Sequence, residues 1–249
     1  MERGLLAMGG LVGSDIKSYY EEWWENPRDP RDQVFRRLNR LIFKKLPPGN
    51  GRKALDIGSG KGTIIGFLLE KGYQAAAVEF NENFVRDLKQ RFPAVEVIEG
   101  DFNVVAIERR FDLVTAVEFI QNLDRDGLRI FFQKVAALTD HLILTVSNKK
   151  SLHGFWAVFR GFIKPFVHVY TPKEIETIVR ASGFEVLSGR GIGLLTPITL
   201  FPDFRWKLIP VWLTKLVNPW ADRIFPRRCH LYYLEAGKSF GKLSRRKLS

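Results

Sequence analysis

A glycine-rich turn near residue 60 constrains the fold of this chain more than any other feature. Residues 54–63 read Ala-Leu-Asp-Ile-Gly-Ser-Gly-Lys-Gly-Thr, so an apolar segment leads into three glycines at alternate positions. Glycine enters the left-handed backbone region at little cost, which allows a tight turn and lets a ligand lie against the backbone. The pattern is typical of a strand, a ligand-binding turn and a helix in an α/β protein.

Short apolar segments alternate with amphipathic segments on both sides of this turn. The expected strands are 53–57, 74–79, 95–99, 111–118 and 141–147, and the expected helices between them are 61–71, 82–92 and 126–138. Such alternation predicts a parallel sheet with helices on both faces. Thr171-Pro172 begins another helix, and residues 184–193 and 229–237 are expected to be further strands.

The segments outside this alternating pattern suggest three additions to the domain 51–238. Residues 1–50 are expected to form a helical N-terminal cap, since apolar residues recur at helical spacing before a Pro-Pro-Gly break. Residues 194–228 are too long and too apolar for a plain loop, and we expect an aromatic lid there, inserted between strands six and seven. Residues 239–249 form a basic tail.

Within the expected lid, hydropathy favours one amphipathic helix. Leu213, Leu216 and Val217 share a helical face with Ile209, and Lys207, Thr214 and Lys215 lie on another. Such a helix can roof a hydrophobic pocket or lie on a membrane surface. The aromatic stretch 151–169 is a second candidate wall for a substrate pocket.

Charge and cysteine content limit the possible partners. The 249 residues carry a formal net charge of +12, and residues 222–249 alone hold eight basic and two acidic side chains. This excess of basic side chains is suited to binding an anionic membrane surface or a nucleic acid, or it simply forms a solvated tail.

The single cysteine, Cys229, excludes an internal disulfide and is interpreted as a strand residue. Without a signal-peptide pattern or a long apolar run, we expect a cytoplasmic protein, peripheral at the membrane at most.

Two acidic residues near the turn indicate what kind of ligand it binds. Asp56 lies two residues before Gly58, where a carboxylate repels a pyrophosphate and attracts a cationic ligand. Thr63 stands where a dinucleotide fingerprint has Gly or Ala. Glu79 ends the second strand, where an acidic residue in this layout holds ribose hydroxyls.

Four motifs in this order make residues 53–147 resemble the core of class I S-adenosylmethionine (SAM) methyltransferases. The matching segments are Leu55-Asp56-Ile57-Gly58-Ser59-Gly60, Val78-Glu79, Glu99-Gly100-Asp101-Phe102 and Phe111-Asp112-Leu113-Val114. The resemblance implies a doubly wound, seven-stranded Rossmann-like sheet, parallel except for one strand, supplied here by residues 229–237. A dinucleotide-binding domain and a catalytically dead methyltransferase fold are the alternatives.

The resemblance also implies SAM as cofactor and S-adenosylhomocysteine as product. The family's cofactor contacts fall on Asp56, Gly58, Ser59 and Gly60 for the methionine part, Glu79 for the ribose, and Asp101 and Phe102 for the adenine. Arg37 is a candidate for the cofactor carboxylate, with a solvated helix arginine as the alternative, and Phe80 and Glu118 are further cofactor-binding candidates.

A finer similarity points to the ubiquinone-biosynthesis O-methyltransferases. It rests on Trp23-Trp24, Arg37-Leu38-Asn39, Ser147-Asn148-Lys149 and the stretch from Gly193 to Thr199. That group carries Glu-x-x-Glu-His after strand four, which can hold a divalent metal, whereas this chain has Gln121-Asn122 at the last two positions. We therefore expect no metal requirement.

Transfer to a hydroxyl needs a base, because a phenol has a pKa of about 10. We take His153 as the candidate catalytic base, with His168 as the alternative.

The favoured function is O-methylation of a small or amphiphilic acceptor: a phenol, a quinone precursor or a lipid. The alternatives are an RNA methyltransferase, which the charge alone favours, and a non-catalytic SAM-binding protein. Contact with an anionic membrane is the expected additional partnership, ahead of nucleic acid.

Overall fold

The computed structural model describes residues 32–159, 167–195 and 211–238. Its seven strands form one sheet in the order β3-β2-β1-β4-β5-β7-β6. The strands are β1 (Lys53–Ile57), β2 (Gln74–Glu79), β3 (Glu96–Glu99), β4 (Leu113–Ala116), β5 (His141–Ser147), β6 (Glu185–Ile192) and β7 (Leu231–Gly237). Only β7 runs antiparallel to its neighbours within this sheet. The predicted Rossmann-like sheet with one reversed strand is confirmed.

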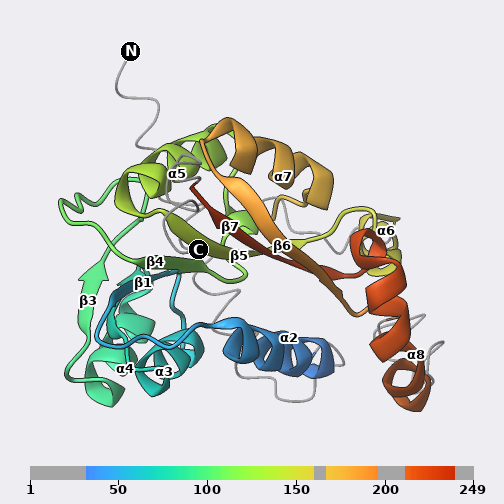
Figure 1. The fold of residues 1–249 in the computed structure, drawn as a ribbon, viewed down its shortest axis with the longest axis horizontal. Coiled ribbons are helices and arrows are strands. Elements are labelled where there is room, and N and C mark those ends of the chain that lie inside the picture. The colour runs from blue at the N-terminus through green and yellow to red at the C-terminus, as the bar shows by residue number, and fades with distance from the viewer. Residues whose placement is uncertain (1–31, 160–166, 196–210, 239–249) are drawn as a thin grey trace, which may run out of the picture.

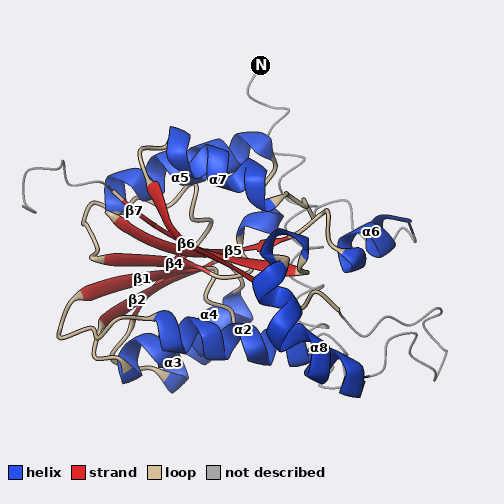
Figure 2. Cartoon of the chain, turned by 45° about the vertical axis from the view of Figure 1, so that its right-hand side comes forward, coloured by secondary structure: helices blue, strands red, loops and turns tan. Residues whose placement is uncertain are grey.

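Helices cover both faces of the sheet. They are α2 (Asp32–Lys45), α3 (Thr63–Glu70), α4 (Glu82–Arg91), α5 (Arg125–Leu138), α6 (Leu152–Phe159), α7 (Pro172–Ala181) and α8 (Val211–Ile224), with short 3-10 turns η1 (Ile120–Asn122) and η2 (Pro226–Arg228). Helices α2, α3 and α4 lie on one face, and α5 and α7 lie on the other (Figures 1 and 2). Helices α6 and α8 lie at the end of the sheet where β5 ends and β7 begins.

Local sequence explains where several helices begin. The Asn81 side chain caps α4 by accepting hydrogen bonds from the backbone N–H groups of Asn83 and Phe84. Thr171 and Glu174 form a reciprocal capping box at the start of α7, and Pro172 occupies the first turn. These caps place the helix starts within a residue or two of their predicted positions.

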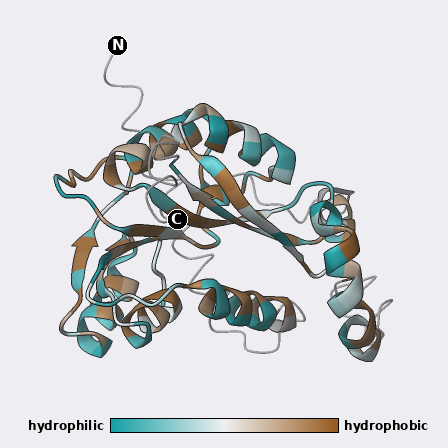
Figure 3. Cartoon of the chain, in the orientation of Figure 1, coloured by the Kyte–Doolittle hydropathy of each residue, from teal (hydrophilic) through white to brown (hydrophobic). Residues whose placement is uncertain are grey.

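The core consists of one apolar cluster on each face of the sheet. The central strands β1, β4 and β5 contribute almost continuous runs of buried residues, as expected for strands covered on both faces. Figure 3 shows hydrophobic residues in the centre of the sheet. Helix α2 joins the cluster on its own face through Val34, Leu38, Ile42 and the following Leu46, which are all buried. The described part of the predicted N-terminal cap, from residue 32, therefore packs directly on the sheet.

Helix α8 packs on the protein through its polar side. The side facing the protein carries Thr214, Asn218 and Asp222, which are 3–7% exposed, whereas Leu216 of the predicted apolar face is 65% exposed. Leu213 and Val217 are half-buried. The sequence left open what covers the apolar face, and the polar side packs inward because Asn218 and Asp222 form hydrogen bonds within the protein. Ile209, Lys207, Trp206 and the rest of 196–210 lie outside the described residues, as do residues 1–31 and the basic tail.

Among the helices that the structure describes, none has the length and apolar content needed to cross a bilayer.

Candidate functional site

The glycine turn connects β1 to α3 at the carboxyl edge of the sheet. Gly58, Gly60 and Gly62 all have positive φ angles, of 69°, 51° and 76°, which side chains other than glycine rarely tolerate. A Cβ atom at Gly58 would also lie 2.5 Å from Cδ2 of Phe119. The turn thus needs glycine for its conformation, and at Gly58 also for its contact with the loop after β4.

Asp56 lies beneath this turn with only 2% of its surface exposed. Its Oδ1 accepts a hydrogen bond of 2.7 Å from the Thr115 hydroxyl of β4. Burial raises the pKa of Asp56 to about 7, the hydrogen bonds from Thr115 and Ser59 oppose that rise, and the charge of Glu79 adds to it. A buried carboxylate that titrates near neutrality is a place where a cationic ligand group is favoured.

The raised pKa makes stability depend on pH in a definite direction. Between the ordinary value of 3.8 and about 7 the folded chain holds a proton that the unfolded chain has lost. The contribution of Asp56 to the free energy of unfolding therefore falls as pH rises through this window, by up to about 4 kcal/mol. Asp56→Asn keeps the acceptor oxygen for Thr115 and should remove this fall. Urea denaturation at pH 4.5, 6 and 8 measures it.

The control is Asp87→Asn, because Asp87 is an exposed carboxylate on α4. The gain in stability of Asp56→Asn over wild type should grow with pH, while Asp87→Asn stays parallel to wild type. Parallel curves for all three proteins would contradict the assignment of this titration to Asp56.

Glu79 ends β2 and holds the glycine turn in place. It is 4% exposed. Its Oε2 accepts the Gly60 N–H at 2.7 Å, and its Oε1 accepts the N–H groups of Phe80 and Asn81, both at 2.9 Å. The carboxylate therefore joins the turn after β1 to the start of α4. Carboxylate oxygens have room for more than one donor each, so hydroxyl groups of a ligand can share them.

The residues predicted to contact the adenine, and the neighbouring Phe80, differ in their solvent exposure. Asp101 is exposed at the end of β3, where its Oδ1 accepts the Asn103 N–H at 2.8 Å. Phe80 is half-buried beside Glu79. The Phe102 ring is 1% exposed and packs edge-on against Phe119 and Phe131. The structure thus places the Phe102 ring in the core, underneath the site.

Glu118 follows β4 in a backbone conformation unusual for its type, with φ of 55°. Its carboxylate accepts hydrogen bonds from Thr145 Oγ1 at 2.8 Å and Ser147 Oγ at 3.2 Å, both on β5. Gln121 Nε2 donates to the same carboxylate at 3.4 Å, while its own buried Oε1 has no hydrogen-bond partner in the described part of the chain. This cluster adds acceptor oxygens to the site edge.

The sequence analysis did not include three groups that lie around Glu118 in the candidate site: Thr145, Ser147 and the Gln121 oxygen. The sequence does contain a sign of the first two, because Thr145 and Ser147 are two residues apart on β5 and therefore point to the same face of the sheet.

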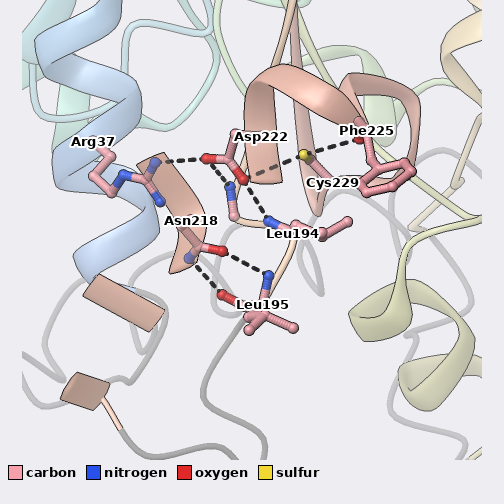
Figure 4. Close-up of polar contacts among 8 residues, drawn as sticks. Arg37, Leu194, Leu195, Asn218, Asp222, Phe225 and Cys229 are labelled. Carbon is pink, nitrogen blue, oxygen red and sulfur yellow. Dashed lines mark hydrogen bonds and ion pairs between the residues drawn. The ribbon is translucent and has the colours of Figure 1, made fainter. Parts of the chain in front are cut away.

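Arg37 has a partner other than the predicted cofactor carboxylate. Its Nη2 lies 2.6 Å from Asp222 Oδ2, so α2 is joined to α8 (Figure 4). Asp222 also accepts the backbone N–H groups of Gly193 and Leu194 at 3.0 and 2.8 Å, and the Cys229 thiol at 3.4 Å. This contact uses one of the five guanidinium N–H donors, so Arg37 positions α8 at the end of β6, and its contact with a cofactor carboxylate stays a prediction.

The histidines occupy three environments. His153 on α6 stacks on His230 with ring centroids 4.0 Å apart, which places it at the start of β7. The backbone N–H of His168 donates to the Gln121 carbonyl at 2.7 Å, beside the loop after β4. His141 Nε2 lies 3.0 Å from Glu235 and fixes β5 to β7. His153 stays a predicted base, since none of these contacts tests its role.

Cysteine and metal chemistry find no support in the described residues. Burial raises the pKa of the Cys229 thiol, and the neighbouring Asp222 raises it further, so the reactive thiolate is disfavoured. Within residues 32–159, 167–195 and 211–238, three or more His, Cys, Asp or Glu side chains nowhere gather as a metal site would require. The expectation of no metal requirement stays a prediction.

Comparison with known proteins shows which methyltransferases this chain is similar to. Residues 54–141 match the family model described as a methyltransferase domain. An uncharacterized methyltransferase of Alkaliphilus oremlandii is 30% identical over 117 residues, which cover 43% of this chain and 54% of that protein. A ribosomal RNA small subunit methyltransferase A of Geobacter sulfurreducens is 41% identical over 63 residues, or 24% of this chain and 23% of that protein. This chain thus spans at most about half the length of these relatives.

A solved structure extends the similarity to the whole fold. The magnesium protoporphyrin IX methyltransferase from Synechocystis, solved with bound S-adenosylhomocysteine, superposes with a TM-score of 0.63 at 14% identity. The match covers 91% of this chain and all of that one, which shows that the two share a fold. Residues 54–141 therefore resemble a methyltransferase domain, and the chain has the same Rossmann-like fold as that methyltransferase.

Proposed function

We propose that this chain transfers the methyl group of SAM to a hydroxyl of a small or amphiphilic acceptor: a phenol, a quinone precursor or a lipid. The observation that supports this most is the set of carboxylates around the left-handed glycine turn. Asp56 and Glu79 are both buried there at the carboxyl edge of the sheet, and Asp101 is exposed beyond them.

The residues present fit SAM better than a dinucleotide. A pyrophosphate at the turn would be repelled by the Asp56 carboxylate, whereas an ammonium and a sulfonium are attracted to it. Glu79 has acceptor capacity for ribose hydroxyls, and Asp101 is open to an adenine amine. When bound, SAM supplies a methyl group already activated by the positive sulfur. The protein then has to hold the acceptor in line and exclude water.

The Glu118 cluster is proposed as the acceptor side of the site. Glu118 and the Gln121 Oε1 atom offer acceptor oxygens, so they favour a ligand group that donates a hydrogen bond, such as a hydroxyl. A proton leaving that hydroxyl can pass to a carboxylate or a histidine, and His153 remains the candidate base. These groups support O-methylation.

Membership of the ubiquinone-biosynthesis group is part of the same proposal and rests on sequence. Trp23-Trp24 lies outside the described residues. Asn148 of the Ser147-Asn148-Lys149 motif is buried, and its Nδ2 donates to the carbonyls of Arg227 and Cys229 at 3.0 and 2.9 Å. Asn148 thus holds the segment that leads into β7 in place. This structural role supports a similarity of fold to the ubiquinone-biosynthesis group more than a common methyl acceptor.

RNA methylation is the second candidate. It is favoured by the net charge of +12 and by the 63-residue similarity to the ribosomal RNA methyltransferase. The matched segment is too short to support the inference that this chain has the same substrate.

Transfer of radiolabelled methyl from SAM distinguishes the candidates. The purified chain is incubated with bacterial lipid extract, with a set of phenols, or with ribosomal RNA, and the label is followed into organic-soluble or RNA fractions. We expect label in the organic-soluble fraction, dependent on Glu79. Label only in RNA would favour the second candidate, and binding of SAM without any transfer would favour a non-catalytic SAM-binding protein.

We expect methyl transfer to survive metal removal. Gln121 and Asn122 stand where the related group has an anionic residue and a histidine, and neutral amides bind a divalent cation weakly. Activity should change by less than twofold after treatment with EDTA. Activity that is lost with EDTA and restored by magnesium would contradict this prediction.

Localisation belongs to the proposal as well. We place the enzyme in the cytoplasm, in contact with the membrane surface through the region argued next.

A further inference from the structure

Helix α8 presents a continuous hydrophobic stripe to solvent. Four large apolar side chains recur at every fourth position and are 65–70% exposed: Trp212, Leu216, Trp220 and Ile224. Phe225 extends the stripe and is 53% exposed. Figure 3 shows hydrophobic residues recurring along α8 at the right-hand rim of the molecule. Monomeric proteins seldom expose so many large apolar side chains side by side, so the stripe calls for a partner.

Hydrogen bonds fix the helix in this orientation. Asn218 accepts the Leu195 N–H at 2.9 Å and donates to the Leu195 carbonyl at 2.8 Å (Figure 4). Asp222 is held by Arg37 and by two backbone N–H groups. Positions two apart on a helix differ by about 200°, so Thr214, Asn218 and Asp222 lie opposite the stripe. The apolar side faces outward because the polar side is the one that is bound.

The exposed charged side chains beside the stripe, within residues 211–228, are all positive. In residues 211–228 the exposed charged side chains are Lys215, Arg223, Arg227 and Arg228, and the single acidic residue, Asp222, is buried and paired with Arg37. A partner that covers the stripe therefore has to carry negative charge next to an apolar layer. An anionic lipid bilayer has this arrangement, with phosphate and serine headgroups above acyl chains.

A hollow continues the stripe at its C-terminal end. It has a volume of about 560 Å³ and lies between α7, β6 and η2. Ile224 and Phe225 line it together with Arg180, Arg227 and Arg228. Arg180 and Arg227 share the buried carboxylate of Glu176, while Arg228 forms no ion pair within the described part of the chain. Arginine side chains in a hollow of mixed polar and apolar lining suit a lipid phosphate.

We propose that α8 docks this protein on anionic membranes, with the stripe Trp212, Leu216, Trp220, Ile224 and Phe225 in the interface and the neighbouring basic residues on the headgroups. Tryptophan favours the headgroup level of a bilayer. Asp222 binds the end of β6, so the docked face also brings the carboxyl edge of the sheet toward the bilayer. Docking does not depend on methyl transfer, and its test is independent of the proposed catalytic function.

Cosedimentation with vesicles tests the proposal in the absence of SAM. The full chain is mixed with phosphatidylcholine vesicles containing 0 or 30% phosphatidylserine, at low and high salt. We expect binding that needs phosphatidylserine and weakens with salt. The double variant Trp212→Ser/Trp220→Ser should bind at least tenfold more weakly, and Arg223→Glu roughly fivefold or more weakly, from the attraction of a single charge to an anionic surface.

Matched controls come from α5, on the other side of the sheet. Ile130→Ser and Arg129→Glu change exposed residues of the same kinds and should bind as wild type does. Circular dichroism checks that α8 variants keep their helix content. The proposal is overturned by no binding to phosphatidylserine vesicles at low salt, or by binding that the α8 variants leave unchanged. A dimer in sedimentation equilibrium that Trp220→Ser abolishes, without vesicle binding, would assign the stripe to a second copy of the chain.

Discussion

Asp222→Ala is expected to lower the free energy of unfolding by about 3 kcal/mol. The substitution removes the acceptor for the Arg37 guanidinium and for the N–H groups of Gly193 and Leu194. Breaking a buried, hydrogen-bonded ion pair from one side leaves its donors without a partner, which costs more than the pair itself contributes. Urea denaturation followed by circular dichroism measures the loss.

Arg223→Ala is the matched control, since Arg223 is the next residue on α8 and is exposed. It should change stability by less than about 0.5 kcal/mol, as surface substitutions usually do. Asp222→Asn should fall between the two, because it keeps one acceptor oxygen but loses the charge. A loss below 1 kcal/mol in Asp222→Ala would show that α8 is not held by this residue, and the outward orientation of its stripe would lose its cause.

Glu79→Ala is expected to weaken SAM binding by about 10- to 100-fold. A charge-assisted hydrogen bond contributes roughly 1.5–3 kcal/mol, and the ribose contact is of that type. The structure adds a second reason, since the same carboxylate holds the N–H groups of Gly60, Phe80 and Asn81. Without it the glycine turn loses its tie to α4. Isothermal calorimetry with SAM measures the change.

Glu82→Ala provides the comparison, because Glu82 is an exposed carboxylate in the first turn of α4. It should bind SAM within twofold of wild type. Thermal unfolding of both variants separates a loss of binding from a loss of fold. Unchanged SAM affinity in a folded Glu79→Ala variant would remove Glu79 from the site.

The sheet and the turn could be predicted because their signals are local. Alternating apolar and amphipathic segments gave all seven strands, and the glycines at 58, 60 and 62 are needed by the positive φ angles found there. The positions of Asp56 and Glu79 follow from the same pattern, since residues at the ends of neighbouring parallel strands meet at one edge of the sheet.

The orientation of α8 and the partner of Arg37 could not be read in the same way. Both depend on contacts between residues far apart in the chain, such as Arg37 with Asp222. Hydropathy placed Leu216 on an apolar helix face without showing what covers that face, and the side that packs on the protein carries Thr214, Asn218 and Asp222. The buried Phe102 ring likewise depends on Phe119 and Phe131, which a motif match does not include.

Calorimetric titration of the wild-type chain with SAM tests the central claim most directly. At pH 8 the Asp56 carboxylate is largely ionised, since its pKa is about 7. We predict saturable binding of one SAM per chain and retained binding of S-adenosylhomocysteine. We also predict no measurable binding of NAD, because the Asp56 carboxylate would repel its pyrophosphate. Binding of NAD without SAM or S-adenosylhomocysteine would contradict the account.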